Sequence, residues 1–98
     1  MEKSAGLAIV YDNMLLLVHS TGSPWWASYG IPKGWIEQNE NALAAAKRET
    51  FEEVGINVPP ELINGATQSL YYLKDNRAYK QIIYYVARIN DLLISSII

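Results

Sequence analysis

The chain has 98 residues, half of them hydrophobic and 18% charged, with a formal charge of −2 and no cysteine. These values fit one small globular domain and exclude a disulfide framework and a thiolate metal site. The Lys and Arg residues are scattered and form no basic stripe, so duplex nucleic acid is not an expected partner. The longest apolar runs, residues 14–18 and 82–87, are too short to span a membrane, and we expect a cytoplasmic protein with no membrane partner.

The N-terminal part of the chain predicts a β-hairpin followed by a loop. Residues 7–11 and 14–18 are β-prone runs separated only by Asp12 and Asn13, a pair that tolerates positive φ and suits a two-residue turn. Residues 20–28 are rich in Gly, Ser, Thr and Pro and therefore predict a loop, and a short extended segment follows it.

Residues 39–54 carry the strong helix signal of this sequence. Asn39 or Asn41 can cap its start, alanines fill its middle, and Gly55 stands where a C-terminal cap glycine belongs. The side chains expected on its buried face are Leu43, Ala46, Thr50 and Val54.

The C-terminal part predicts a second hairpin and an apolar end. Residues 66–73 and 78–88 are rich in Tyr and Ile, and the polar residues 74–77 between them suit a turn. Residues 90–98 have the spacing of a short helix and carry several large apolar side chains. Because these side chains need a cover, we expect either a truncated chain or a homodimer contact over residues 92–98.

Three glutamates, Glu49, Glu52 and Glu53, stand at positions i, i+3 and i+4 of the predicted helix, so their carboxylates project from one face. Each like-charge pair costs roughly 0.2–0.5 kcal/mol, and acidic residues in the last turn oppose the helix dipole. A solvated acidic face is the more common explanation of such a cluster. A divalent cation, Mg²⁺ or Mn²⁺, would remove the conflict, because these ions bind oxygen ligands in a concentrated negative field.

The longer pattern around these glutamates resembles the Nudix box. Gly34 is followed after five positions by Glu40, and after seven more by the run Arg48-Glu49-Thr50-Phe51-Glu52-Glu53-Val54-Gly55-Ile56. All seven fixed identities of the box are present, and Thr50 is a mild departure where the box has an aliphatic residue. The resemblance implies an α/β fold, the Nudix α/β/α sandwich with a mixed sheet. We expect residues 1–98 to form a single Nudix hydrolase domain whose C-terminal helical layer is truncated.

The resemblance also implies a role for each matching residue. The carboxylates implied as metal ligands and catalytic groups are Glu49, Glu52 and Glu53. The carbonyl oxygen of Gly34 would be a further ligand, and Glu49 is the candidate general base. Arg48 would orient the glutamates through charge-assisted hydrogen bonds while it is held by Glu40.

Outside the box, Lys33, Trp26 and Tyr72 are the candidate substrate contacts. Lys33 could bind a pyrophosphate oxygen or be an ordinary exposed lysine, and Trp26 could stack on a nucleobase or pack in the core. The Pro-Lys-Gly sequence that enters the box, and the tyrosines Tyr71 and Tyr72 about fifteen residues after it, resemble the dinucleoside polyphosphate branch of the family.

We therefore expect metal-dependent hydrolysis of pyrophosphate bonds in nucleoside diphosphates linked to another moiety, with a small-molecule nucleotide as the substrate. The alternative is a catalytically inactive Nudix-fold module that binds a nucleotide or has a regulatory role. The presence of a single glutamate after the box, Glu61, favours that alternative.

Overall fold

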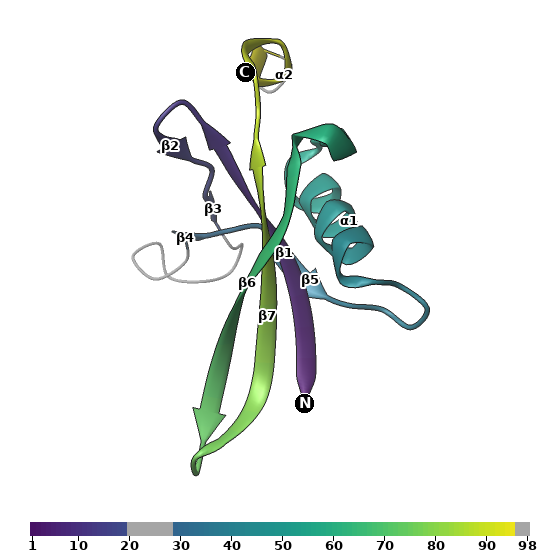
Figure 1. Cartoon of the computed structure of the whole chain (residues 1–98), viewed down its shortest axis with the longest axis vertical. Helices are drawn as coiled ribbons and strands as arrows, with labels where there is room; N and C mark the ends of the chain where they lie inside the picture. The colour runs from purple at the N-terminus through teal and green to yellow at the C-terminus, as the bar shows by residue number, and fades with distance from the viewer. Residues whose placement is uncertain (20–28, 96–98) are drawn as a thin grey trace.

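The computed structural model describes residues 1–19 and 29–95 and places one long helix beside a curled sheet (Figure 1). The strands are β1 (Glu2–Tyr11), β2 (Met14–Leu15), β3 (Val18–His19), β4 (Tyr29–Gly30), β5 (Lys33–Trp35), β6 (Ile63–Lys74) and β7 (Arg77–Arg88). The helices are α1 (Ala42–Val54), the 3₁₀ helix η2 (Pro60–Leu62) and α2 (Asp91–Ser95). The predicted mixed α/β architecture is confirmed, with a short helical layer.

A mixed five-stranded sheet organises the domain around β1. One edge of β1 pairs in parallel with β7, which in turn pairs antiparallel with β6. The other edge of β1 pairs antiparallel with β5 near its start and with β2 near its end. Strands β3 and β4 form a separate two-stranded ladder. The β6–β7 hairpin extends past the N-terminal end of β1, as Figure 1 shows.

Both predicted hairpins are present, but the second strand of the first hairpin is shorter than the predicted 14–18, because it ends at Leu15 and Val18 pairs with β4 instead. Of the pair Asp12 and Asn13 expected in its turn, Asp12 alone has positive φ. Asp12 has φ 54° in the turn between β1 and β2, and Asp75 and Asn76 have φ 53° and 64° in the turn between β6 and β7. Two consecutive residues of positive φ match the right-handed twist of the flanking strands. The strands of the second hairpin are longer than the sequence predicted, and β1 begins at Glu2.

The core lies between one face of the sheet and α1. From β1, Leu7 and Ile9 are buried, and from α1, Ala45 and Ala46 have no exposed surface. Alanines at these positions let the helix backbone approach the sheet closely, because they add little volume between the layers. Leu43 and Val54, predicted for the buried face, are only partly buried, whereas Ala46 and Thr50 are fully buried as expected.

Helix α1 is capped at both ends by residues the sequence identified. The Oδ1 atom of Asn41 accepts a hydrogen bond from the Ala44 N–H at 2.8 Å, and Gly55, at φ 74°, donates its N–H to the Phe51 carbonyl at 2.8 Å. The helix begins at Ala42 rather than near Asn39 because Asn39 adopts φ 68° in a preceding turn.

The apolar C-terminal segment forms the expected short helix, α2. Asn90 Oδ1 accepts a hydrogen bond from the Leu93 N–H at 3.0 Å, and the Leu93 side chain packs against the core. Residues 96–98 lie outside the described residues, so the predicted homodimer contact there stays a prediction. Within residues 1–19 and 29–95, no helix has the length and apolar character needed to cross a membrane.

Candidate functional site

The backbone of β5 has free hydrogen-bonding groups that face side chains of α1, and the strand register explains which ones they are. The hydrogen bonds from Leu7 N to the Pro32 carbonyl and from Ile36 N to the Lys3 carbonyl tie β5 to β1. Because backbone groups alternate in an antiparallel ladder, those of Lys33 and Trp35 point away from β1. They point toward the side chains of α1.

Arg48 is the centre of a charged network at this edge. Its Nε and Nη2 atoms donate to the two carboxylate oxygens of Glu40 at 2.8 and 3.0 Å, and Nη2 also donates to the Trp35 carbonyl at 2.9 Å. Its Nη1 atom donates to Glu49 at 2.9 Å and to Glu52 at 3.3 Å. One guanidinium therefore joins the turn before α1, strand β5 and two box glutamates, which confirms the predicted contact with Glu40.

The charges of this network shift the pKa values of its members. Hydrogen bonds from Arg48, and then one from the Glu37 backbone, hold the pKa of Glu40 below its usual range. The hydrogen bond to Glu40 is also the main cause that raises the pKa of Arg48, so the guanidinium stays charged. Glu37, at 3.6 Å from Arg48 Nη1, is a further member that the sequence analysis missed.

Gly34 makes room for the carboxylate of Glu49. A Cβ atom at Gly34 would overlap both carboxylate oxygens of Glu49, so the glycine is required for this close approach of helix and strand. The Gly34 carbonyl, which the sequence analysis expected as a further metal ligand, is directed toward β1 by the ladder. The carbonyl that faces outward beside the glutamates is that of Lys33.

Glu53 lies one helical turn beyond Glu49 and also reaches β5. Partial burial, and then the negative charge of Glu49, raise the pKa of Glu53, against a hydrogen bond from the Lys33 backbone. Two carboxylates that repel each other thus lie against β5, Glu49 over Gly34 and Glu53 at the Lys33 backbone. Among residues 1–19 and 29–95, no three acidic or histidine side chains lie close enough together to hold a metal ion in this structure.

Thr50 shows why the departure from an aliphatic residue is tolerated. Its side chain is fully buried under the sheet, and its hydroxyl donates to the Ala46 carbonyl at 2.7 Å, one turn earlier in α1. The hydroxyl is satisfied inside its own helix, so its methyl group can pack as an aliphatic residue would.

The predicted substrate contacts lie outside the Arg48 network. Lys33 lies on β5, and its positive charge acts on Glu53, whose pKa it lowers against the larger effects of burial and of Glu49. Tyr72 lies on the β6–β7 hairpin, 38% exposed, with Lys80 Nζ 5.5 Å from its ring centroid and the Tyr79 ring edge-on at 6.4 Å. Trp26 lies outside the described residues.

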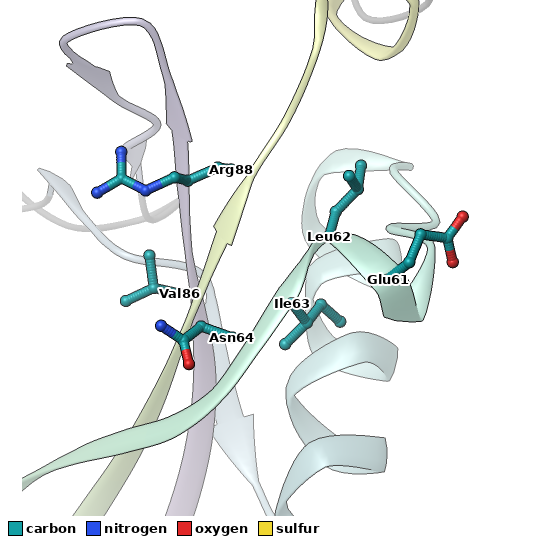
Figure 2. A pocket seen from close by; sticks show the side chains of 6 residues that line it. All are labelled: Glu61, Leu62, Ile63, Asn64, Val86 and Arg88. Carbon is teal, nitrogen blue, oxygen red and sulfur yellow. The ribbon is translucent and has the colours of Figure 1, made fainter.

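A separate cavity of about 380 Å³ lies where η2 meets the β6–β7 hairpin (Figure 2). It is lined by Glu61, Leu62, Ile63, Asn64, Val86 and Arg88. Figure 2 shows the charged ends of Glu61 and Arg88 pointing in opposite directions, so they do not converge on one ligand. None of the box glutamates lines this cavity, and Glu61 is thus placed apart from them.

Comparisons with known proteins agree on one family. The family model described as NUDIX domain matches residues 1–93. The asymmetrical bis(5'-nucleosyl)-tetraphosphatase of Mus musculus is 37% identical over 78 residues, which cover 79% of this chain and 50% of that protein. The chain thus spans about half the length of the curated relatives it matches.

Two solved structures have a similar fold. A C. elegans Ap4A hydrolase in a binary complex superposes with a TM-score of 0.73 at 28% identity, over 93% of this chain and 68% of that chain. A bifunctional NMN adenylyltransferase/ADP ribose pyrophosphatase from Francisella tularensis, complexed with AMP and a Mn ion, has a TM-score of 0.73 at 19% identity, over 90% of this chain and 27% of that chain. The second likeness concerns the fold alone.

Proposed function

Because this chain belongs to the NUDIX family, we propose that it hydrolyses pyrophosphate bonds in nucleoside diphosphates linked to another moiety. The observation that carries the proposal is that Glu49 packs on Gly34 and Glu53 accepts a hydrogen bond from the Lys33 backbone, beside an arginine that is bonded to Glu49. The similarity to asymmetrical tetraphosphatases supports dinucleoside polyphosphates as the favoured substrates.

Mg²⁺ or Mn²⁺ fits the donor set at this edge. Glu49, Glu52 and Glu53 would hold it, together with the backbone carbonyl of Lys33, which faces away from β1. The fit is supported by the repulsion between Glu49 and Glu53, which a cation would relieve and which, after partial burial, is the second cause of the raised pKa of Glu53. When bound, the ion would supply charge neutralisation at the phosphates and a more acidic attacking water.

The residues of the chain would then divide the remaining work. Glu49 would accept a proton as water attacks phosphorus and the anhydride P–O bond breaks toward the leaving phosphate. Lys33 would bind a phosphate oxygen as a point charge. Arg48 touches no substrate in this scheme and acts by holding Glu49 and Glu52 in place.

The test is a phosphate-release panel of nucleotides with Mg²⁺ or Mn²⁺, on the wild type and on Glu53→Gln. We expect turnover of diadenosine tetraphosphate and a loss of at least about 100-fold in kcat for the variant, as expected when a charged ligand is removed. Glu61→Gln is the matched control, because Glu61 lies in the separate cavity, and it should keep wild-type rates.

Two results would contradict the proposal. One is turnover of no nucleotide in the panel, and the other is equal turnover by the wild type and Glu53→Gln. Tight nucleotide binding in calorimetry without hydrolysis would favour the alternative, a catalytically inactive nucleotide-binding or regulatory module.

A further inference from the structure

Four residues from four adjacent strands form one row across the sheet. Lys33 on β5 pairs with Gly6 on β1, Gly6 pairs with Tyr84 on β7, and Tyr84 pairs with Gln68 on β6. Residues directly opposite one another in neighbouring strands present their side chains to the same face. Leu7, the neighbour of Gly6, is part of the core against α1, so this row lies on the other face of the sheet.

Gly6 leaves a small space that its two row neighbours share. A Cβ atom at Gly6 would stand 2.8 Å from the Cβ of Lys33, 3.1 Å from the Cε1 of Tyr84 and 2.6 Å from the Pro32 carbonyl oxygen. These separations are shorter than ordinary van der Waals contacts. The Tyr84 ring and the Lys33 Cβ atom therefore both lie close to Gly6, one on each side of it. No other residue type fits at position 6 without moving one of them.

The backbone and Cβ atom of Lys33 are thereby restrained from two directions. Its backbone is bonded to Glu53 on the side of α1, and its Cβ faces the Tyr84 ring across Gly6 on the other side. Tyr84 is half-buried, so its ring has little freedom to move away. The Tyr84 Cε1 atom thus takes up space above Gly6, on the β7 side of the Lys33 Cβ.

We propose that Tyr84, through the space above Gly6, is a positioning residue that directs the Lys33 ammonium group toward the phosphates of the substrate. The inference rests on the proposed function, because Lys33 has a phosphate to bind only if the site takes a nucleotide pyrophosphate. It adds two residues, Tyr84 and Gly6, that position Lys33, and both lie outside the box.

A double-mutant cycle separates this role from simple packing. The variants are Tyr84→Leu, Lys33→Met and the two combined, and the readouts are the Kd of a non-hydrolysable methylene analogue of diadenosine tetraphosphate with Mg²⁺, and KM and kcat for the natural compound. We expect Tyr84→Leu to raise Kd and KM about 5- to 10-fold with kcat changed less than about two-fold, the pattern of lost ground-state binding. In the Lys33→Met background the same change should have no further effect.

Two controls complete the design. Tyr84→Phe keeps the aromatic ring, so this variant should bind the analogue with the wild-type Kd. Tyr71→Leu removes a hairpin tyrosine on the sheet face opposite to Tyr84, where its hydroxyl accepts a hydrogen bond from its partner Gln81. This variant should leave Kd unchanged. If Tyr84→Leu melts below the assay temperature, Tyr84→Met takes its place in the cycle.

The outcomes distinguish the two levels of the argument. Equal weakening by Tyr84→Leu with and without Lys33 would overturn the positioning role, as would a wild-type Kd for Tyr84→Leu, while the proposed function would stand. A wild-type Kd for Lys33→Met would overturn the role of both residues in substrate binding. A wild type that neither binds nor hydrolyses any nucleotide would overturn the proposed function itself, and the positioning role with it.

Discussion

Arg48 donates two hydrogen bonds to the carboxylate of Glu40, from Nε at 2.8 Å and from Nη2 at 3.0 Å. The two residues are eight positions apart, and their contact closes the turn before α1 against the middle of the helix. The remaining donors of the same guanidinium reach Glu49, Glu52 and the Trp35 carbonyl. The orientation of these carboxylates therefore depends on several guanidinium donors at fixed angles, which a lysine ammonium cannot replace.

Arg48→Lys should show that dependence directly. Lysine keeps the charge but cannot bond Glu40, Glu49 and Trp35 together, so we expect kcat/KM to fall about 10- to 100-fold, as for other residues that orient metal ligands. Steady-state kinetics with Mg²⁺ measures the change. Lys47→Arg, one position earlier in α1, is the control and should keep wild-type kinetics. Wild-type kinetics for Arg48→Lys would show that charge alone is sufficient.

Gly34→Ala should disrupt the site from the strand side. The added methyl group would overlap the Glu49 carboxylate, so either α1 or the carboxylate must move, and we expect a lower melting temperature and a loss of activity. Gly30→Ala is the matched control, because a Cβ at Gly30 meets nothing within 4 Å. Scanning fluorimetry and the phosphate-release assay measure both variants, and equal behaviour of the two would contradict the packing argument.

Asn41→Ala should destabilise the domain by about 1 kcal/mol, because it removes the side-chain acceptor that caps the Ala44 N–H. Asn41→Asp keeps an acceptor at the helix N-terminus and should stay near the wild type. Urea unfolding followed by circular dichroism gives the free energies of unfolding. If Asn41→Ala and Asn41→Asp lost the same stability, the cap would contribute nothing.

The lowered pKa of Glu40 predicts how the free energy of unfolding depends on pH below about pH 4.5. Arg48 lowers this pKa in the folded state, so the charged carboxylate binds fewer protons there than in the unfolded chain. The stabilisation is therefore present above the ordinary glutamate pKa of about 4.5 and is lost as the pH falls through the lower folded value. In urea unfolding from pH 7 to pH 2.5, the difference between wild type and Glu40→Gln should shrink below pH 4.5. A difference that stays constant down to pH 2.5 would contradict this linkage.

Metal binding should stabilise the folded chain by mass action. With Mn²⁺ and the methylene analogue at about 100 times Kd, the expected gain is about 2.7 kcal/mol, and chelation should reverse it. Glu53→Gln should lose most of this gain, whereas Glu61→Gln should keep it. An unchanged melting temperature for the wild type would contradict the assignment of a divalent cation to this edge.

The local features of the fold could be predicted from the residues alone. The Asp12 and Asp75-Asn76 turns, the Asn41 cap and the Gly55 end of α1 all depend on the conformational preferences of a few adjacent residues. The box spacing likewise placed Glu49, Glu52 and Glu53 on one face, because a helix has a fixed period. Element lengths were less predictable, since β6 and β7 are extended by pairing with each other.

The contacts that give these residues a role needed the folded chain. Nothing in the spacing of Gly34 and Glu49 says that a carboxylate packs on the glycine, and nothing in the order of Gly6, Lys33 and Tyr84 says that they lie in one row. Such neighbours come from strands and a helix far apart along the chain. Periodicity constrains residues only within an element, while the register between elements is set by how the whole core packs.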